Sequence, residues 1–143
     1  MQDDVATEAA TLAAIEAESG SEGPLLPILH RIQHALGHVP EAALPMIADA
    51  LNITRAEVHG VVSFYPDFRD APVPGKVVKI CRAEACQAQG GAALEAAAAA
   101  LSGRAHVEPV YCLGLCANGP AAMVEDRPMA AATVEKIAQA LAQ

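Results

Sequence analysis

The chain has 143 residues and a formal net charge of −8, which disfavours binding to nucleic acid phosphates or to anionic membrane surfaces. Its hydrophobic content is high, at 53%, but no apolar run approaches the ~18 residues that a membrane-spanning helix needs. The length allows one compact domain, or a helical half beside a smaller α/β half. The N-terminus, M-Q-D-D, is acidic where a secretory signal needs positive charge, so we expect a cytoplasmic protein with reduced thiols.

Negative charge is concentrated in the first half of the chain. Residues 1–70 contain 11 acidic and 3 basic residues, a net charge of −8, whereas residues 71–143 contain 6 of each. Solubilising charge on helix exteriors accounts for this, and the alternative is an acidic face that docks a basic partner subunit. A Pro- and Gly-rich segment, 66–75, marks the boundary between the halves. We therefore expect an α+β fold, with a helical bundle domain at 1–70 and an α/β domain at 71–143.

Four helices are predicted in the first half. They cover residues 5–19, 24–36 and 43–51, followed by a segment from Thr54 that ends before Pro66. Alanines make up most of the apolar face of the first helix, and Pro24 suits the first position of the second. Thr54 and Glu57 have the spacing of a capping box. At the end of the fourth helix, core packing of Phe64 and Tyr65 is favoured over contact with a partner.

Two other functions for these helices are disfavoured. His30 and His34 are spaced for one helix face and His38 follows, but there is no H-E-x-x-H, so these histidines are expected in the core or facing solvent. Residues 47–62 also resemble a helix-turn-helix, which would indicate a DNA-binding sensor. Its second helix offers only Arg55 and His59 to DNA, and the surrounding charge is negative. We interpret the segment as helix packing.

The second half has the pattern of a strand–helix–strand unit followed by a hairpin and a helix. Strands are predicted at 76–80, 105–111, 121–124 and 129–131, and helices at 92–101 and after Thr133, which serves as a cap. A polar turn, 125–128, joins the last two strands. The crossover rule makes the first two strands parallel. This order of elements is typical of a thioredoxin-like domain.

All four cysteines of the chain lie in this half and form two pairs. Cys81 and Cys86 follow the first strand as C-x4-C, and Cys112 and Cys116 follow the second as C-x3-C. Parallel strands end at the same edge of a sheet, so two pairs on loops after these strands converge on one site. The spacing favours four thiolate ligands of a [2Fe–2S] cluster. Zinc, two disulfides, and buried unliganded thiols remain open alternatives.

The motifs C-R-A-E-A-C-Q and C-L-G-L-C-A-N-G-P, with V-H-G-V-V-S-F-Y-P-D-F upstream, resemble the thioredoxin-like [2Fe–2S] subunit family. Its members include an iron–sulfur subunit of respiratory complex I, the gamma subunit of soluble NAD-dependent formate dehydrogenases, and a subunit of NAD-reducing hydrogenases. The resemblance covers about residues 25–124 and implies that Cys81, Cys86, Cys112 and Cys116 bind the cluster. The R-A-E-A-C-Q loop is most similar to the formate dehydrogenase gamma subunit.

The resemblance implies an electron-transfer subunit. The chain has no glycine-rich phosphate loop or dinucleotide fingerprint of its own, so NAD and flavin are expected to bind to another subunit. Its partners would be a flavin- and NAD-binding subunit and a molybdenum- or tungsten-containing formate-oxidising subunit. The equivalent subunit of complex I or of a hydrogenase is the near alternative, and a zinc-stabilised interaction module is the alternative from another class. Gly114 is expected to let backbone N–H groups approach the sulfurs, and Arg82 and Lys79 are candidates to offset negative charge.

Overall fold

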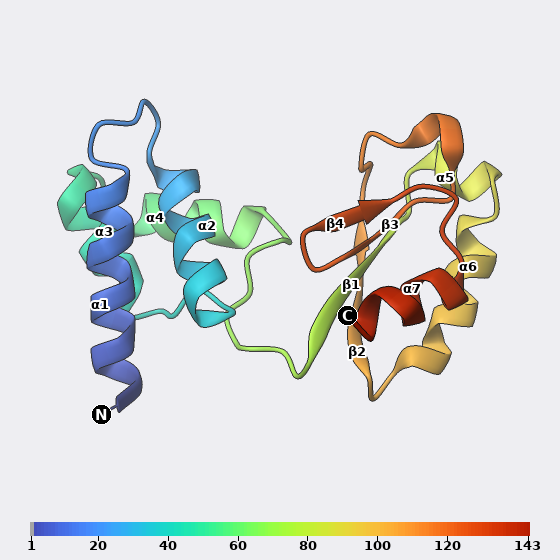
Figure 1. Cartoon of the computed structure of the whole chain (residues 1–143). Helices are drawn as coiled ribbons and strands as arrows, with labels where there is room; N and C mark the ends of the chain where they lie inside the picture. The colour runs from blue at the N-terminus through green and yellow to red at the C-terminus, as the bar shows by residue number, and fades with distance from the viewer. Residues whose placement is uncertain (1) are drawn as a thin grey trace. The chain divides into compact units, whose positions relative to one another are not determined.

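The computed structural model describes residues 2–143 (Figure 1). The chain forms two compact units; the first ends at Pro72 and the second begins at Val73. The first unit is helical, and the second contains a mixed four-stranded sheet with helices, which confirms the expected α+β class. None of the described helices is long and apolar enough to cross a membrane.

The helical unit consists of four helices: α1 (Gln2–Ala17), α2 (Leu25–Leu36), α3 (Ala43–Leu51) and α4 (Arg55–Phe64). Helix α1 packs against α2 and α3, and α3 packs against α4. The core combines aliphatic side chains from α2, α3 and α4 with one alanine of α1. Its largest fully buried members are Ile28, Leu29, Ile32, Ile47 and Val58.

Local sequence signals set the ends of these helices. Helix α2 ends at Gly37, as predicted, although Pro24 precedes the helix as its N-cap. The predicted capping box is confirmed: the Thr54 hydroxyl accepts from the Glu57 amide, and the Glu57 carboxylate accepts from the Thr54 amide. Both interactions satisfy amides that have no partner within the first turn of α4.

Helix α1 differs from its prediction in extent and in its buried face. It covers Gln2–Ala17 in place of 5–19, and Asp4 in its first turn complements the positive end of the helix dipole. Two threonines, Thr7 and Thr11, are buried on this helix in addition to alanine. The Thr11 hydroxyl donates to the Thr7 carbonyl at 2.7 Å, so its burial leaves no unpaired polar group.

The predicted core packing of Phe64 is wrong, because its side chain is 76% exposed. The buried stripe of α4 follows Val58, Val61 and Val62, which have helical spacing. Position 64 is about 120° around the helix from this stripe. Tyr65 lies just beyond the helix, is 40% exposed, and meets the Phe64 ring edge-on at 5.1 Å between ring centroids.

The second unit follows the predicted order of elements. They are β1 (Lys76–Cys81), α5 (Glu84–Ala88), α6 (Gly91–Ala98), a 3-10 turn η1 (Ala99–Leu101), β2 (Ala105–Val110), a 3-10 turn η2 (Cys116–Asn118), β3 (Ala122–Val124), β4 (Arg127–Met129) and α7 (Val134–Leu141). The strands are ordered β2-β1-β3-β4. Strands β1 and β2 are parallel, as predicted, and β3 is antiparallel to both β1 and β4.

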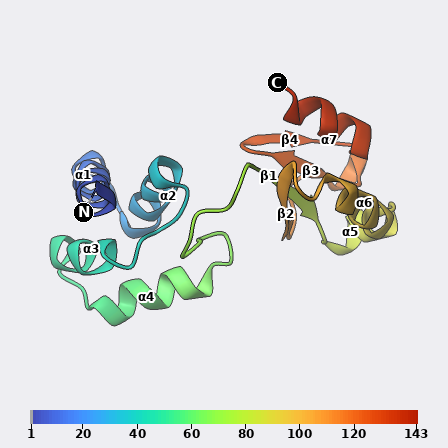
Figure 2. The same ribbon diagram turned by 90° about the horizontal axis from the view of Figure 1, so that it is seen from below.

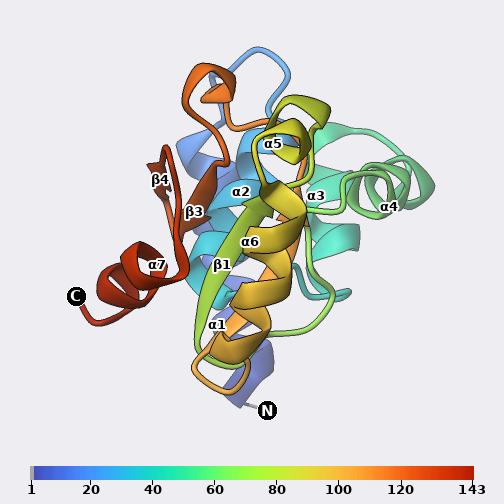
Figure 3. The same ribbon diagram turned by 90° about the vertical axis from the view of Figure 1, so that its right-hand side faces the viewer.

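Helices α6 and α7 cover the same face of this sheet (Figures 2 and 3). Their side chains enclose a core with Val78 and Ile80 of β1 and Val124 of β3, and Ile137 of α7 is fully buried there. The opposite face carries Lys79, which alternates with those core residues along β1. The Thr133 cap of α7 is confirmed, since its hydroxyl accepts from the Lys136 amide.

Three predicted boundaries in this unit need correction. The helix expected at 92–101 is α helical only to Ala98 and closes with the 3-10 turn η1. The hairpin turn is shorter than 125–128, because β4 begins at Arg127 and Glu125 takes a left-handed conformation with φ 54°. The segment between the first two cysteines is not only a loop, since Cys86 lies in the short helix α5.

Candidate metal centre

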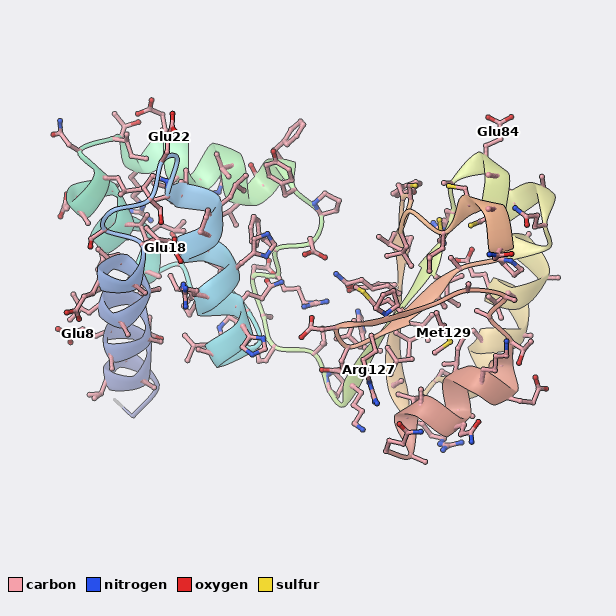
Figure 4. The ribbon with its side chains drawn as sticks, turned by 45° about the horizontal axis from the view of Figure 1, so that its top comes forward. Glu8, Glu18, Glu22, Glu84, Arg127 and Met129 are labelled. Atoms are coloured by element: carbon pink, nitrogen blue, oxygen red, sulfur yellow. The ribbon has the colours of Figure 1, made fainter. Side chains whose placement is uncertain are left out.

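The two cysteine pairs lie at the ends of two neighbouring parallel strands. Cys81 is the last residue of β1, and the register pairs it with Val110, the last residue of β2. Cys86 follows in α5, while Cys112 lies two residues beyond β2 and Cys116 opens η2. The parallel pairing therefore brings together cysteines that are 31 residues apart in sequence, as between Cys81 and Cys112. Sulfur atoms gather at this end of the unit in Figure 4.

One direct contact connects the pairs, and another lies within the second pair. The Cys112 amide donates to Cys81 Sγ at 3.3 Å, and Cys112 Sγ lies 3.5 Å from Cys116 Sγ. Beside them, the Arg82 amide donates to the Val110 carbonyl at 2.8 Å and extends the pairing of the strands by one residue. The site is asymmetric, because the Cys81 and Cys86 side chains are buried whereas Cys112 and Cys116 are exposed.

Backbone amides point at the sulfur of Cys81. Burial raises the pKa of this thiol, but hydrogen bonds from the amides of Ala83, Cys112 and Leu113 and from the Cys86 thiol together outweigh burial, and the net pKa is lowered. Amides aimed at a sulfur stabilise its thiolate, which is the form that binds metal. Burial raises the pKa of Cys86, and the neighbouring sulfur of Cys112 raises the pKa of Cys116.

The loop between the second pair has a left-handed backbone at two positions, Cys112 with φ 73° and Gly114 with φ 75°. This conformation turns the chain tightly enough for the Gly114 amide to donate back to Cys112 Sγ at 3.4 Å. An amide therefore reaches a sulfur at Gly114, as expected, but the left-handed backbone and not the missing side chain allows it, because an added Cβ would meet nothing within 4 Å. A residue with a side chain would adopt this backbone only with strain.

The two cations proposed to offset negative charge are both paired with carboxylates. The Arg82 guanidinium forms an ion pair and several hydrogen bonds with Glu95 of α6, and it also interacts with the Tyr111 hydroxyl. Lys79 Nζ lies 3.7 Å from Glu108 on the neighbouring strand. Each cation therefore belongs to a neutral pair, and its effect on the thiols is weaker than that of a free charge.

One polar side chain links the segment that contains Cys86 to the segment that contains Cys116, and the sequence analysis did not identify this link. Gln89, just after α5, donates through Nε2 to the Cys116 carbonyl at 2.8 Å. Its Oε1 accepts from the Gly119 amide at 3.0 Å. The partners are 27 and 30 residues away, so no local pattern could have indicated these bonds.

The three histidines singled out in the sequence lie in the helical unit. The His30 ring packs against Phe68 with 4.9 Å between centroids, and His38 Nδ1 lies 3.2 Å from the Leu36 carbonyl. Within residues 2–143, no three His, Cys, Asp or Glu side chains are placed to surround one metal ion.

These features define a class of protein: a small α/β domain that carries two cysteine pairs at the ends of neighbouring parallel strands. A family model for the thioredoxin-like [2Fe–2S] ferredoxin matches residues 11–143, and the chain belongs to that family. Its cofactor is a [2Fe–2S] cluster, which replaces the zinc, disulfide and free-thiol alternatives. Four cysteine thiols are the ligands that such a cluster needs, and the amides around Cys81 suit a negatively charged centre.

Curated relatives agree with this family. A subunit of NADH-quinone oxidoreductase from Escherichia coli K12 is 30% identical, and the match covers 94% of this chain and 93% of the relative. The corresponding NADH-quinone oxidoreductase subunit from Aquifex aeolicus is 30% identical over 71% of this chain and 70% of the relative. The NADP-reducing hydrogenase subunit HndA from Solidesulfovibrio fructosivorans is 27% identical over 90% of this chain and 81% of the relative.

Proposed function

We propose that Cys81, Cys86, Cys112 and Cys116 are the four cluster ligands. The observation that carries this proposal is the hydrogen bond from the Cys112 amide to Cys81 Sγ at 3.3 Å, which joins the two pairs across the ends of β1 and β2. These are also the chain's only cysteines, so a cluster held by four thiolates requires all of them. The site belongs to the second unit, which we propose as a cluster domain (71–143) that follows a helical domain (1–70) in the chain.

The function proposed for this centre is one-electron transfer within an NAD(P)-linked oxidoreductase complex. A bound [2Fe–2S] cluster supplies one-electron redox chemistry. The protein supplies the cysteine ligands of the cluster, and backbone amides donate hydrogen bonds to sulfur. Cys112 and Cys116 are exposed, so their side of the site is open to a partner. The relatives are subunits of NADH-quinone oxidoreductase and of an NADP-reducing hydrogenase, so a flavin- and NAD-binding subunit is the expected redox partner.

The parent complex that we propose is a soluble, cytoplasmic NAD-dependent formate dehydrogenase. The loop C-R-A-E-A-C-Q supports this proposal, because it resembles the corresponding loop of the gamma subunit of that enzyme. A molybdenum- or tungsten-containing formate-oxidising subunit would then complete the complex. The names of the relatives favour the alternative, the equivalent subunit of complex I or of a hydrogenase.

Two measurements test these proposals. Anaerobically purified full-length chain should contain about two irons and two sulfides and give an S = 1/2 EPR signal after reduction by one electron. Substitution of any one of the four cysteines by alanine should abolish that signal, and one zinc per chain without colour would refute the proposed ligands. Affinity purification from the native host should then recover a molybdenum or tungsten protein and formate-dependent NAD reduction. Recovery of hydrogenase or quinone reductase subunits instead would identify a different parent complex.

A further inference from the structure

Gln89 connects the two segments that carry the cysteines. Its side-chain amide forms three hydrogen bonds: Nε2 donates to the carbonyls of Ala85 and Cys116, each at 2.8 Å, and Oε1 accepts from the Gly119 amide at 3.0 Å. Ala85 immediately precedes Cys86, so the amide reaches a peptide next to one cysteine and the carbonyl of another. Gln89 uses both of its donor hydrogens and its acceptor oxygen in these bonds.

The other anchors of the second cysteine segment lie elsewhere in the unit. The Ala121 carbonyl accepts from the Cys81 amide at 3.0 Å, and the Asn118 carbonyl accepts from the Ala131 amide at 2.6 Å. Those bonds join the segment to β1 and to the chain that follows β4. The side-chain bonds of Gln89 instead join it to the segment that contains Cys86. Without them, the link between the Cys86 segment and the second cysteine segment rests on the sheet and on the Ala121 amide, which donates to Cys86 Sγ.

We propose that Gln89 is a positioning residue that fixes the distance and orientation between the two cysteine pairs. The inference rests on the proposed ligand set, because positioning has a purpose only if the pairs share one cluster. Outer hydrogen bonds that orient metal ligands affect metal retention although they do not touch the metal. Gln89 is exposed, so its bonds compete with water, and their effect is to limit motion of the ligand segments more than to stabilise the fold.

Gly119 offers an independent way to disturb the same contact. A Cβ atom at this position would lie 3.0 Å from Gln89 Nε2 and 3.1 Å from its Cδ, so the Gln89 side chain would have to shift by a few tenths of an ångström. The backbone φ of Gly119 is −74°, which alanine adopts without strain. Gly119→Ala therefore tests the position of the Gln89 side chain and adds no unfavourable φ angle.

The first experiment uses the full chain without iron, so it does not depend on the cluster. Amide hydrogen exchange is compared in wild type, Gln89→Ala and Gln87→Ala. Gln87 is the matched control, because it lies two residues earlier, in α5, and its side chain has no hydrogen bond among those described for residues 2–143. We expect the Gly119 amide to exchange at least about threefold faster in Gln89→Ala and to be unchanged in Gln87→Ala. Equal rates in all three proteins would overturn the proposed contact.

The second experiment measures iron in the loaded full chain. We expect Gln89→Ala to lose iron to a chelator about threefold to tenfold faster than Gln87→Ala, and to broaden the EPR lines as the ligand geometry becomes less uniform. Gly119→Ala should give a similar loss, and the double variant should be no worse than either single variant, because both act through one contact. Additive losses, or rates equal to the control, would overturn the positioning role. A wild-type chain that binds no iron would refute the proposed ligand set, while the exchange data would still decide whether the contact exists.

Discussion

The two cysteine pairs differ in how the fold holds them. Cys81 and Cys86 are buried, in the last residue of a strand and in a short helix, with Ala121 beside them. Cys112 and Cys116 are exposed on a segment whose shape depends on left-handed residues and on side-chain bonds from elsewhere. The first pair is therefore fixed by the core of the domain, and the second by contacts that solvent reaches. We therefore expect movement of the exposed pair to determine how easily the site loses iron.

Thiol reactivity gives the largest expected difference between the pairs. In the full chain without iron, iodoacetamide should modify Cys112 and Cys116 at least about a hundredfold faster than Cys81 and Cys86. The lowered pKa of Cys81 favours reaction, but its thiol is fully buried and is reached only when the structure opens. Mass spectrometry of timed digests measures each site.

Denaturant provides the control for this experiment. In strong urea the four rates should become similar, because burial no longer protects the first pair. If Cys81 reacts as fast as Cys112 without urea, the core does not hold the first pair in the absence of iron, and the two pairs do not differ in the way described.

Gly114→Ala tests how much the second pair depends on its backbone conformation. An added Cβ meets nothing within 4 Å, so the cost comes only from the φ of 75°. That strain is about 1–2 kcal/mol, which we expect to appear as roughly tenfold faster loss of iron. Gly103→Ala is the matched control, since its φ is 92° and its added Cβ also meets nothing, but it lies before β2 and away from the cysteines. Equal iron loss in both variants would mean that strain anywhere in the unit loosens the site.

The sequence predicted those features that depend on neighbouring residues. The end of α2 at Gly37, the Thr54–Glu57 box and the Thr133 cap each need only a few adjacent residues, and all three are confirmed. The crossover rule likewise predicted the parallel strands beyond which the cysteine pairs lie. Features that depend on distant contacts were missed.

The missed features have specific physical causes. Five residues give too little periodicity to reveal α5, so Cys86 was expected on a loop. Bonds from Gln89 cross 27 and 30 residues. The exposure of Phe64 depends on which face of α4 the other helices cover, and an apolar residue type alone does not indicate that face.

A change in the helical unit should leave the difference between the cysteine pairs intact. Thr54→Ala removes the cap of α4 and should lower the free energy of unfolding of that unit by about 1 kcal/mol. Thermal unfolding followed by circular dichroism measures the effect, and Ser63→Ala, in the same helix and away from the cap, is the control. If Thr54→Ala changes iron loss or cysteine reactivity, the two units do not behave independently.

The same cap should depend on pH. Hydrogen bonds from the Thr54 amide and hydroxyl lower the pKa of Glu57 below its ordinary value of 4.5. A carboxylate with a lowered pKa contributes stability that is present above pH 4.5 and is lost as the pH falls through the folded-state value. The difference in stability between wild type and Glu57→Gln should therefore shrink below pH 4.5. If the difference in stability between the two proteins stays constant until Glu57 is fully protonated, the charge of Glu57 does not contribute to the cap.

The smallest expected effect concerns the charge next to the buried pair. Glu95→Gln leaves the guanidinium of Arg82, the residue that follows Cys81, without its carboxylate partner, so this positive charge is no longer offset. Positive charge stabilises the more negative reduced state, and the reduction potential should rise by on the order of tens of millivolts. Redox titration followed by EPR measures this shift, with Glu108→Gln, which removes the carboxylate charge 3.7 Å from Lys79 Nζ, as the comparison. A lower potential in Glu95→Gln would show that the ion pair acts on the site through structure and not through charge. The buried pair would then depend on side-chain contacts, as the exposed pair does.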